Sequence, residues 1–304
     1  MDRFREMESF IAVVEAGSFV GAADLLRVTK AAVSRGVMEL EARLGARLLQ
    51  RTTRRLSLTE AGRAYYGRCK QILAEVEEAD SAVGVVTGHP VGRLRINAPF
   101  SFGILHLAPL WGPFMERYPD VELEVTLADR MVDVVEEGFD VIVRISRLED
   151  SSLVYRRLAS TRILACASPE YLARNGSPAS VEDLARHPVI AYTYAAQGDQ
   201  WRFSTPDGER EVLTRPRMRT NNGDTCRAVA LAHQGIVLQP DFLVSDDIAA
   251  GRLVEVLPDC RGPEIGIFAV YPSRKHLSVK VRALVDFLVD AFAAPRGWGR
   301  AGAV

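Results

Sequence analysis

Residues 18–62 read SFVGAADLLRVTKAAVSRGVMELEARLGARLLQRTTRRLSLTEAG, and this stretch decides how the first part of the chain folds. Its apolar spacing predicts a short helix over residues 19–26, a three-residue turn and a further helix over residues 30–44. Thr29 is suited to cap the second of these helices and Gly45 is suited to end it. Two helices joined by so tight a turn predict a helix-turn-helix.

The flanking residues extend this prediction on both sides. Upstream, residues 4–16 carry apolar side chains three and four positions apart, which is typical of one face of a helix. Gly17 suits the end of that helix, and Ser18 suits the N-cap of the next one. Downstream, residues 46–62 predict a short wing of two strands.

Positive charge is concentrated in this region. Residues 27–58 hold eight basic and two acidic residues, a net charge of +6. The whole chain of 304 residues has 38 Lys and Arg against 39 Asp and Glu, and its 48 % hydrophobic and 25 % charged residues are ordinary for a globular protein. A basic field over the whole molecule is therefore excluded, and any affinity for nucleic acid must be local. A charge run alone is usually a solvated helix face, but this one coincides with the helix-turn-helix.

The last helix of such a motif lies in the major groove, with its N-terminal residues against the base edges. Arg35 can offer its guanidinium fork to guanine, Ser34 can bond a base or a phosphate, and Ala31 is small enough to lie against a thymine methyl group. Lys30 suits a phosphate, because its ammonium is a point charge. The candidate DNA contacts are Thr29, Lys30, Ala31, Ser34 and Arg35 on the helix, with Arg51, Thr52, Arg54 and Arg55 on the wing.

Residues 3–61 resemble, without a gap, the winged helix-turn-helix of LysR-type transcriptional regulators. The segments AVSR, LEARLG and RTTRRLSLTEAG carry the resemblance, although the family usually has other residues where this chain has Lys30, Ala31 and Gly36. The resemblance implies a sequence-specific regulator that binds double-stranded DNA at an interrupted inverted repeat and has RNA polymerase as a further partner.

After the wing, apolar or small residues recur at alternating steps of four and three over residues 58–86, about 43 Å of helix. The positions are Leu58, Gly62, Tyr65, Cys69, Ile72, Val76, Ala79, Val83 and Val86. This spacing favours a helix that pairs with its twin over one that packs on its own domain. In the family the equivalent linker helix pairs antiparallel, which implies a homodimer and further a homotetramer, with Cys69 as a small core residue.

From residue 92 onward, strand-like and helix-like segments alternate, which predicts an α/β fold with largely parallel sheets. VELEVTL and GIVLQP are strand-like, MVDVVEEG at residues 131–138 is helix-like, and a last amphipathic helix is expected over residues 278–292. About 200 residues are enough for two lobes.

This part resembles the effector-binding domain of the CrgA-like branch of the same family, on APFSFG, LADRMVDVVEEGFDVIVRI and NNGDTCRAVALAHQGIVLQPDFLV. The resemblance implies an all-α winged helix-turn-helix followed by a two-lobed α/β domain like the periplasmic binding proteins, with crossover strands near Ser160 and Ile265. The implied boundaries are 1–58 for the DNA-binding domain, 59–86 for the linker helix, 87–91 for a hinge, 92–161 with 266–293 for lobe I, 162–265 for lobe II and 294–304 for a loose tail.

In such a fold, small ligands bind between the lobes at the carboxyl ends of strands. Helices would begin at this cleft after Pro99 and after Asn222, and a helix N-terminus favours an anion. The expected effector is therefore an anionic or aromatic small molecule. The candidate contacts are Ser101, Phe102, Arg144, Tyr192, Asn222, Thr225 and Gln239.

Several of these residues have a simpler interpretation. Ser101 and Asn222 can equally be plain N-caps. Arg144 can equally bond a nearby aspartate, Asp133 or Asp140.

Other functions have less support. The five histidines are scattered, and no HExxH, GxSxG or phosphate-binding loop is present, so no enzyme is expected. Four cysteines without CxxC spacing predict neither a zinc site nor a disulfide scaffold, and no cofactor is expected. Cys226, early in a helix, leaves a redox sensor open. A DNA-binding architectural protein without an effector also stays open. The charged start and the prolines and glycines within the uncharged residues 96–115 predict a cytoplasmic protein with no membrane partner.

Overall fold

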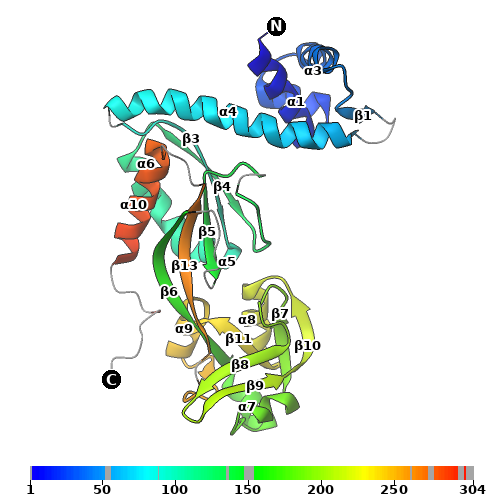
Figure 1. The fold of residues 1–304 in the computed structure, drawn as a ribbon. Coiled ribbons are helices and arrows are strands. Elements are labelled where there is room, and N and C mark those ends of the chain that lie inside the picture. The colour runs from blue at the N-terminus through cyan, green and yellow to red at the C-terminus, as the bar shows by residue number, and fades with distance from the viewer. Residues whose placement is uncertain are drawn as a thin grey trace. The chain divides into compact units, whose positions relative to one another are not determined.

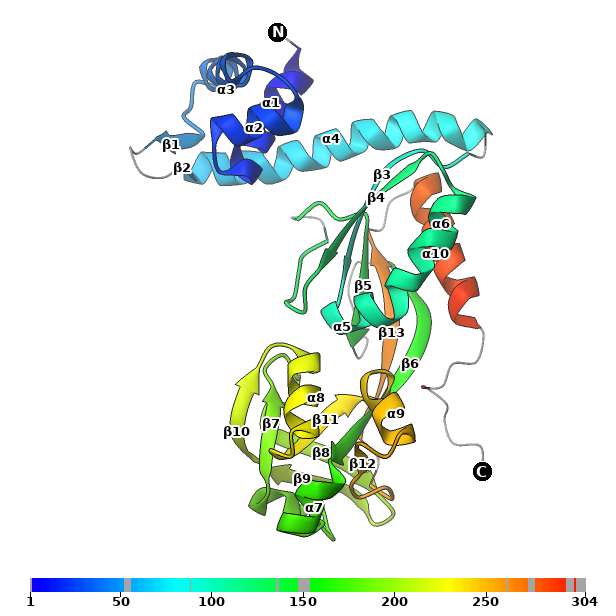
Figure 2. The ribbon, with the colours of Figure 1, turned by 180° about the vertical axis from the view of Figure 1, so that it is seen from behind.

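A computed structural model describes residues 2–51, 56–87, 89–134, 137–146, 154–260, 262–272, 277–293 and 298 (Figures 1 and 2). The chain divides into two compact units. The first comprises Met1–His89 with Asp133–Gly138, and the second comprises Pro90–Val132 with Phe139–Val304.

The first unit consists of helices and a two-stranded sheet. Its elements are α1 (Arg3–Ala16), α2 (Phe19–Leu26), α3 (Lys30–Leu44), β1 (Leu49–Arg51), β2 (Leu56–Leu58) and α4 (Glu60–Thr87). Thr29 caps α3 by accepting the N–H of Ala32 at 3.2 Å, and Gly45 ends α3 in the left-handed conformation with φ 64°. The predicted helix-turn-helix is therefore confirmed, and α2 and α3 have the predicted bounds.

The core of this unit lies between α1 and α3, with α2 and the start of α4 packed around it. Phe10 of α1 and Val33 and Val37 of α3 are fully buried. A Cβ atom on Gly36 would lie 2.8 Å from Ser9 Oγ of α1. Glycine costs the helix about 1 kcal/mol relative to alanine, and the close approach of α1 accounts for its presence.

Helix α4 begins on this same core. Cys69 is fully buried, and Tyr65 packs against the core beside it. The first part of the predicted seam therefore packs on its own domain, contrary to the expectation that the whole seam faces a twin helix. The side chains at seam positions from residue 79 onward lie outside the described part of the chain.

The second unit is built on a sheet with the strand order β10-β7-β11-β6-β13-β5-β3-β4, in which β12 also pairs with β6, and on a separate β8–β9 hairpin (Figure 1). The strands are β3 (Gly92–Ala98), β4 (Val121–Leu127), β5 (Val141–Ser146), β6 (Val154–Ala167), β7 (Pro188–Tyr192), β8 (Gln200–Thr205), β9 (Gly208–Leu213), β10 (Arg215–Thr220), β11 (Ile236–Pro240), β12 (Val254–Glu255) and β13 (Glu264–Tyr271). The helices are α5 (Phe100–Phe102), the π-helix η1 (Gly103–Leu107), α6 (Ala108–Arg117), α7 (Pro169–Asn175), the 3-10 helix η2 (Glu182–Arg186), α8 (Gly223–Leu231), α9 (Asp241–Ala249) and α10 (Val279–Ala293).

Strand β6 belongs to both halves of this sheet. It pairs with β13 as far as Arg162 and with β11 from Ile163 onward. The half with β4, β3, β5 and β13 forms lobe I, and the half with β11, β7 and β10 forms lobe II (Figures 1 and 2). The sheet is mixed rather than largely parallel as predicted, because β6 and β13 run antiparallel to each other and to their neighbours where they cross between the lobes.

Residues 131–138 do not form the predicted helix. Where described, they make a single turn, in which the N–H of Glu137 donates to the carbonyl of Asp133 at 3.1 Å. The guanidinium of Arg144 bonds the carbonyl of Val132, an interaction that holds the segment against strand β5 instead.

The uncharged residues 96–115 fold as the end of β3, the helices α5 and η1, and most of α6. In the part of the chain that the structure describes, no helix is long and apolar enough to span a bilayer.

Candidate functional site

The N-terminal end of α3 presents the side chains that were predicted to read DNA. Lys30, Ala31 and Arg35 are exposed and Ser34 is half-buried. Neither Lys30 nor Arg35 forms an ion pair or side-chain hydrogen bond with any residue that the structure describes. Thr29 is exposed but serves as the helix cap. Two exposed cations at the end of a helix, unpaired among the described residues, are suited to a polyanion.

The wing is described only in part. Strands β1 and β2 pair antiparallel, with Leu49 opposite Leu58. Thr52, Arg54 and Arg55 lie outside the described residues, as does the side chain of Arg51. Their role as DNA contacts stays a prediction.

The second candidate site lies where the two lobes meet. The hydroxyl of Ser101, on α5 of lobe I, donates to Asp224 Oδ2, on α8 of lobe II, at 2.6 Å. The backbone N–H of Phe100 donates to Asp129 Oδ1 at 2.8 Å. Asp129 follows β4, so the N-terminus of α5 already donates to a carboxylate of the chain itself, whereas the N-terminus of α8 is capped by the amide oxygen of Asn222. The chemical nature of the effector stays a prediction.

Tyr192, predicted as an effector contact, lies beside Asp129. The pKa of Asp129 is raised, chiefly because the carboxyl group is buried. The negative charge of Asp224 adds to the rise, whereas the N–H of Phe100 and the hydroxyl of Tyr192 oppose it. Burial also raises the pKa of Tyr192, with Asp129 as a further cause. Tyr192 packs edge to face on Tyr194, whose side chain is 46 % exposed, with ring centroids 5.9 Å apart.

Asn222 and Thr225 bond each other. Asn222 Oδ1 accepts both the backbone N–H and the hydroxyl of Thr225 at 2.9 Å. Asn222 is therefore the N-cap of α8, and its simpler interpretation is the one observed. Ser101 is not a cap, because Pro99 occupies that position of α5.

Gln239, also predicted as an effector contact, lies one residue before the end of β11 and is 2 % exposed. Its Nε2 has no hydrogen-bond partner in the described part of the chain. A Cβ atom on Gly223 would lie 3.2 Å from Gln239 Oε1 and 3.5 Å from Ser101 Oγ, so the amide and the hydroxyl converge on the start of α8.

Phe102 was predicted to contact the effector, but it is fully buried in an aromatic cluster. The ring of Phe102 packs on Phe242 of α9, with centroids 5.2 Å apart, and His106 Nε2 lies 3.1 Å from the carbonyl of Phe242. Trp298 packs on the same rings, 6.0 Å from Phe102 and 4.9 Å from His106. Phe102 is therefore a core residue at the contact between the lobes, and Trp298 of the predicted loose tail joins that core.

Arg144 does not form the alternative bond that was considered for it, to Asp133 or Asp140. Its guanidinium bonds the carbonyl of Val132 and lies 3.4 Å from Met131 Sδ, instead of pairing with Asp133 or Asp140. Through these contacts Arg144 braces the loop after β4.

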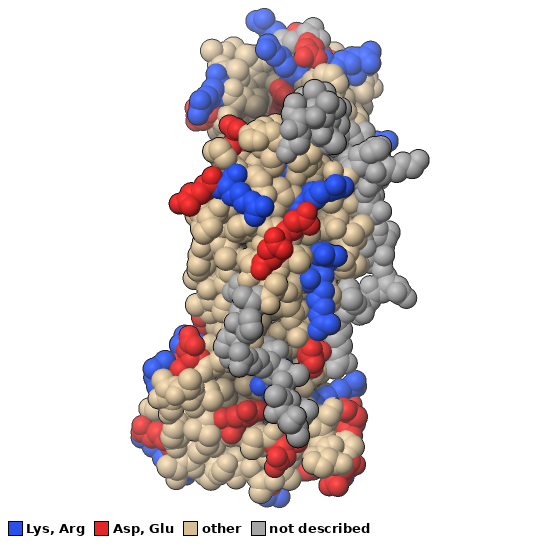
Figure 3. All heavy atoms as spheres, turned by 90° about the vertical axis from the view of Figure 1, so that its left-hand side faces the viewer, with Lys and Arg blue, Asp and Glu red and all other residues tan. Residues whose placement is uncertain are grey.

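Carboxylates elsewhere on lobe I lie beside arginines. Arg95 pairs with Glu124 at 3.3 Å, and Arg93 pairs with Glu122 at 3.5 Å. Figure 3 shows acidic and basic side chains interspersed on the face of the molecule that it presents. Asp129 and Asp224 at the interlobe contact differ, since their hydrogen bonds come from neutral donors.

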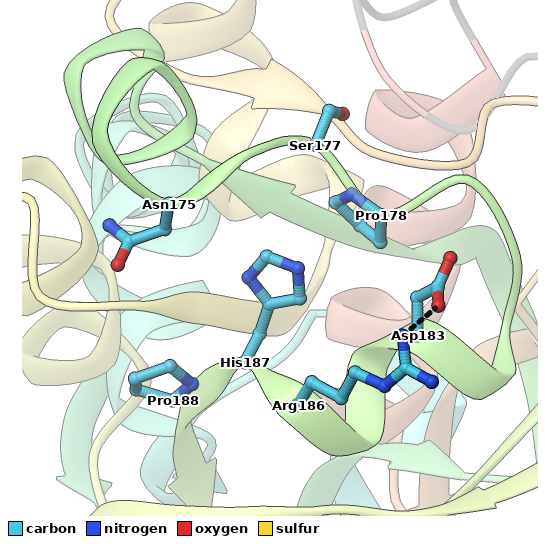
Figure 4. A pocket seen from close by; sticks show the side chains of 7 residues that line it. All are labelled: Asn175, Ser177, Pro178, Asp183, Arg186, His187 and Pro188. Atoms are coloured by element: carbon cyan, nitrogen blue, oxygen red, sulfur yellow. Dashed lines mark ion pairs between the residues drawn. The ribbon is translucent and has the colours of Figure 1, made fainter.

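A separate hollow of about 320 Å³ lies on lobe II (Figure 4). It is lined by Asn175, Ser177, Pro178, Asp183, Arg186, His187 and Pro188. Arg186 pairs with Asp183 at 3.5 Å, and His187 Nδ1 lies 2.9 Å from the hydroxyl of Tyr171. None of the predicted contact residues lines this hollow.

The sequence interpretation missed Asp129 and Asp224. Asp129 comes two positions after the end of β4, and Asp224 lies in the first turn of α8. Carboxylates at the carboxyl end of a strand and at the start of a helix are the signal that could have identified them.

Comparison with known proteins finds a match for each part of the chain. Residues 4–63 match the model of the bacterial regulatory helix-turn-helix protein, lysR family, and residues 87–293 match the LysR substrate binding domain. An HTH-type transcriptional regulator of Xanthomonas campestris pv. campestris is 41 % identical, over 92 % of this chain and 83 % of its own. CrgA of Neisseria meningitidis serogroup C is 37 % identical over 94 % and 95 %.

Solved structures agree with these matches. CrgA of Neisseria meningitidis superposes with a TM-score of 0.62 at 36 % identity, over 95 % of this chain and 98 % of that one. The Vibrio cholerae virulence activator AphB has a TM-score of 0.64 at 29 % identity, over 95 % of this chain and 99 % of its own.

Proposed function

Because this chain belongs to the family of LysR-type transcriptional regulators, we propose that it binds a specific promoter sequence through α3 and the wing and responds to a small molecule bound where its two lobes meet. Its relatives are named as regulators, and it is a regulator rather than an enzyme. The observation that carries the proposal is the N-terminal end of α3, with Lys30 and Arg35 exposed and unpaired among the described residues.

DNA recognition divides between bases and phosphates. Arg35 forks onto guanine in the major groove, while Ser34 and Ala31 contact neighbouring base edges. Contacts to phosphates or to the minor groove come from Lys30 and from the wing residues Arg51, Thr52, Arg54 and Arg55. These contacts fix where the helix lies and which bases it reads.

The regulator acts as an assembly. A single recognition helix reads too few bases for genomic specificity, and a twofold dimer reads two half-sites of an interrupted inverted repeat. The later part of the seam in α4, from residue 79 onward, pairs two copies. Two dimers form a tetramer on the promoter, where RNA polymerase is the further partner.

The effector acts through the contact between the lobes. The Ser101–Asp224 hydrogen bond is a polar contact that joins lobe I to lobe II. A ligand that binds one arrangement of the lobes more tightly than another shifts the population between them. That shift alters the spacing of the reading heads on DNA.

The test uses the full chain and the intergenic DNA beside its own gene. We expect preferential binding of that DNA over a scrambled duplex of equal length, measured by fluorescence anisotropy. Arg35→Ala should weaken the specific complex by about 1–3 kcal/mol and leave the scrambled complex nearly unchanged.

Arg210→Ala is the matched control, since Arg210 is an exposed arginine of strand β9. It removes the same charge and should bind like the parent. Equal binding of promoter DNA by the parent and by Arg35→Ala would show that α3 is not the reading head.

A further inference from the structure

The hollow on lobe II has a polar lining whose formal charges cancel. Besides two prolines, it is lined by the polar residues Asn175, Ser177, Asp183, Arg186 and His187. Arg186 and Asp183 carry opposite charges and pair with each other at 3.5 Å. Such a lining favours neither a cation nor an anion, whereas its polar groups suit a neutral ligand that forms hydrogen bonds.

His187 lies between Asn175 and Pro178 and offers a hydrogen-bond donor to the hollow (Figure 4). Its Nδ1 lies 2.9 Å from the hydroxyl of Tyr171, a residue that is 2 % exposed. Because burial raises the pKa of Tyr171, the hydroxyl keeps its proton at neutral pH. A buried hydroxyl that donates is favoured over one left unsatisfied, so Nδ1 accepts this proton and Nε2 carries the hydrogen of the ring. Nε2 has no partner among the described residues.

The other lining side chains can both donate and accept. The Ser177 hydroxyl forms no side-chain hydrogen bond with the described residues. Asn175 Nδ2 donates to the carbonyl of Tyr171 at 2.9 Å, which leaves Oδ1 as an acceptor. The guanidinium of Arg186 has five N–H groups, so its pair with Asp183 leaves donors for a ligand. A sugar hydroxyl, which donates and accepts at once, matches such a mixture.

The hollow is formed before any ligand arrives. Asp183 Oδ2 accepts the backbone N–H of Ala179 at 3.1 Å and that of Ser180 at 3.2 Å, and so holds the loop that carries Ser177. Pro178 and Pro188 have a fixed φ angle. A ligand therefore has little backbone to order on binding. The volume of about 320 Å³ is at the lower end of the range for small-molecule sites, about 300–1,000 Å³, and suits a monosaccharide rather than a longer glycan.

We propose that this hollow binds a neutral polyhydroxylated compound of monosaccharide size, whose hydroxyl groups bond His187 Nε2, Ser177 and Arg186. The inference does not rest on the proposed function, because the hollow is separate from the contact between the lobes. It gives lobe II a ligand site of its own.

The probes are glucose, galactose and mannose, each with its uronic acid and its 2-amino sugar, and tetrahydropyran-2-methanol, which has the ring without the ring hydroxyls. Saturation-transfer difference NMR on the full chain measures each affinity. We expect at least one hexose to bind with a roughly millimolar Kd. Its uronic acid and amino sugar should bind more weakly, because a charged group loses hydration without gaining an unpaired opposite charge. Tetrahydropyran-2-methanol should not bind measurably.

Two exposed side chains are varied, so that the fold is kept. Arg186→Met should weaken binding of that hexose about tenfold, and Ser177→Ala about threefold. Arg186→Met also leaves Asp183 without its cation and should move the preference toward the amino sugar. The matched control is Arg202→Met, since Arg202 is an exposed arginine of β8 that pairs with Glu211 and does not line the hollow. It should bind like the parent.

Three results would overturn the inference. The first is that none of the three hexoses binds in the millimolar range, and the second is that a uronic acid, an amino sugar or tetrahydropyran-2-methanol binds as tightly as its hexose. The third is unchanged hexose affinity in both Arg186→Met and Ser177→Ala, which would place the sugar elsewhere on the molecule.

Discussion

Gly62 lies where helix α4 crosses the start of the wing. A Cβ atom there would lie 2.0 Å from the backbone carbonyl oxygen of Leu48. A backbone atom cannot swing aside as the end of a flexible side chain can, so any larger residue must push the helix away from the wing. The seam pattern marked Gly62 only as a small position, and the structure shows which contact requires it.

Gly62→Ala should therefore destabilise the protein by about 1–3 kcal/mol, because overpacking shifts the backbone. Gly67→Ala, one and a half turns along the same helix, meets nothing within 4 Å and should gain up to about 1 kcal/mol from helix propensity. Urea unfolding of the two variants and the parent measures both changes. A Gly62→Ala protein as stable as the parent would contradict this packing.

The cysteines are buried to different degrees. Cys69, Cys166 and Cys226 are fully buried, whereas Cys260 is partly exposed. Burial raises the pKa of Cys226 to about 11, so little reactive thiolate exists at neutral pH despite its place early in α8. A redox sensor built on Cys226 is therefore disfavoured.

In the native protein at pH 8, a colorimetric thiol reagent should modify Cys260 rapidly. The three buried thiols should react only at the rate of unfolding or local opening. Mild peroxide should leave promoter binding unchanged. Fast labelling of Cys226, identified by mass spectrometry, would reopen the redox interpretation.

At the scale of elements, helices α8 and α9 are joined by a buried charge cluster. Asp247 on α9 has no exposed surface and accepts from Arg227 of α8 and, at 2.7 Å, from Arg252 after α9. Burial alone would raise the pKa of Asp247, but the hydrogen bonds from the two arginines outweigh it and hold the pKa below its usual value. This cluster therefore holds α8 and α9 together in lobe II.

A carboxyl group with a lowered pKa stabilises the folded state above its ordinary pKa, near 4, and loses that effect as the pH falls through the lowered value. Asp247→Asn should therefore cost on the order of 3 kcal/mol at pH 7, and the difference from the parent should shrink below about pH 4. Asp246→Asn, its exposed neighbour, is the control. Urea unfolding at both pH values gives the answer, and a deficit independent of pH would contradict a charge-based role.

At the scale of the whole molecule, the assembly proposed above uses the part of α4 beyond the packed start. Val83 falls on the predicted seam, and Ser81 falls on the opposite face of the same helix. Val83→Lys should shift the sedimentation equilibrium toward monomer and reduce cooperative binding to the inverted repeat, because a buried lysine in a seam is costly. Ser81→Lys adds the same charge and should stay assembled. Dissociation by both variants or by neither would exclude this seam.

The sequence predicted local structure far better than distant contacts. The helix cap at Thr29 and the helix end at Gly45 depend only on residues within one helical turn. Their residue types are therefore enough to identify them. Ser101 and Asp224 are 123 positions apart, and only the crossing of β6 and β13 brings them together. The types of Phe102 and Arg144 suit an effector contact as well as a core position or a bond to a loop carbonyl, so the sequence alone did not predict the contacts that the structure shows for them.

Because β6 changes partners between Arg162 and Ile163, its hydrogen bonds hold it rigid above and below that point. Any rotation of one lobe against the other must then be absorbed by a few backbone torsion angles. These lie around residues 161–163 of β6 and near residue 263, just before β13. Thr161 donates to the buried Asp241 at 2.6 Å at this same place, which makes the start of α9 travel with the bend. When the lobes rotate, distances between labels within one half-sheet should therefore stay constant. Distances between a label on one half-sheet and a label on the other should change, because the angle between the half-sheets changes.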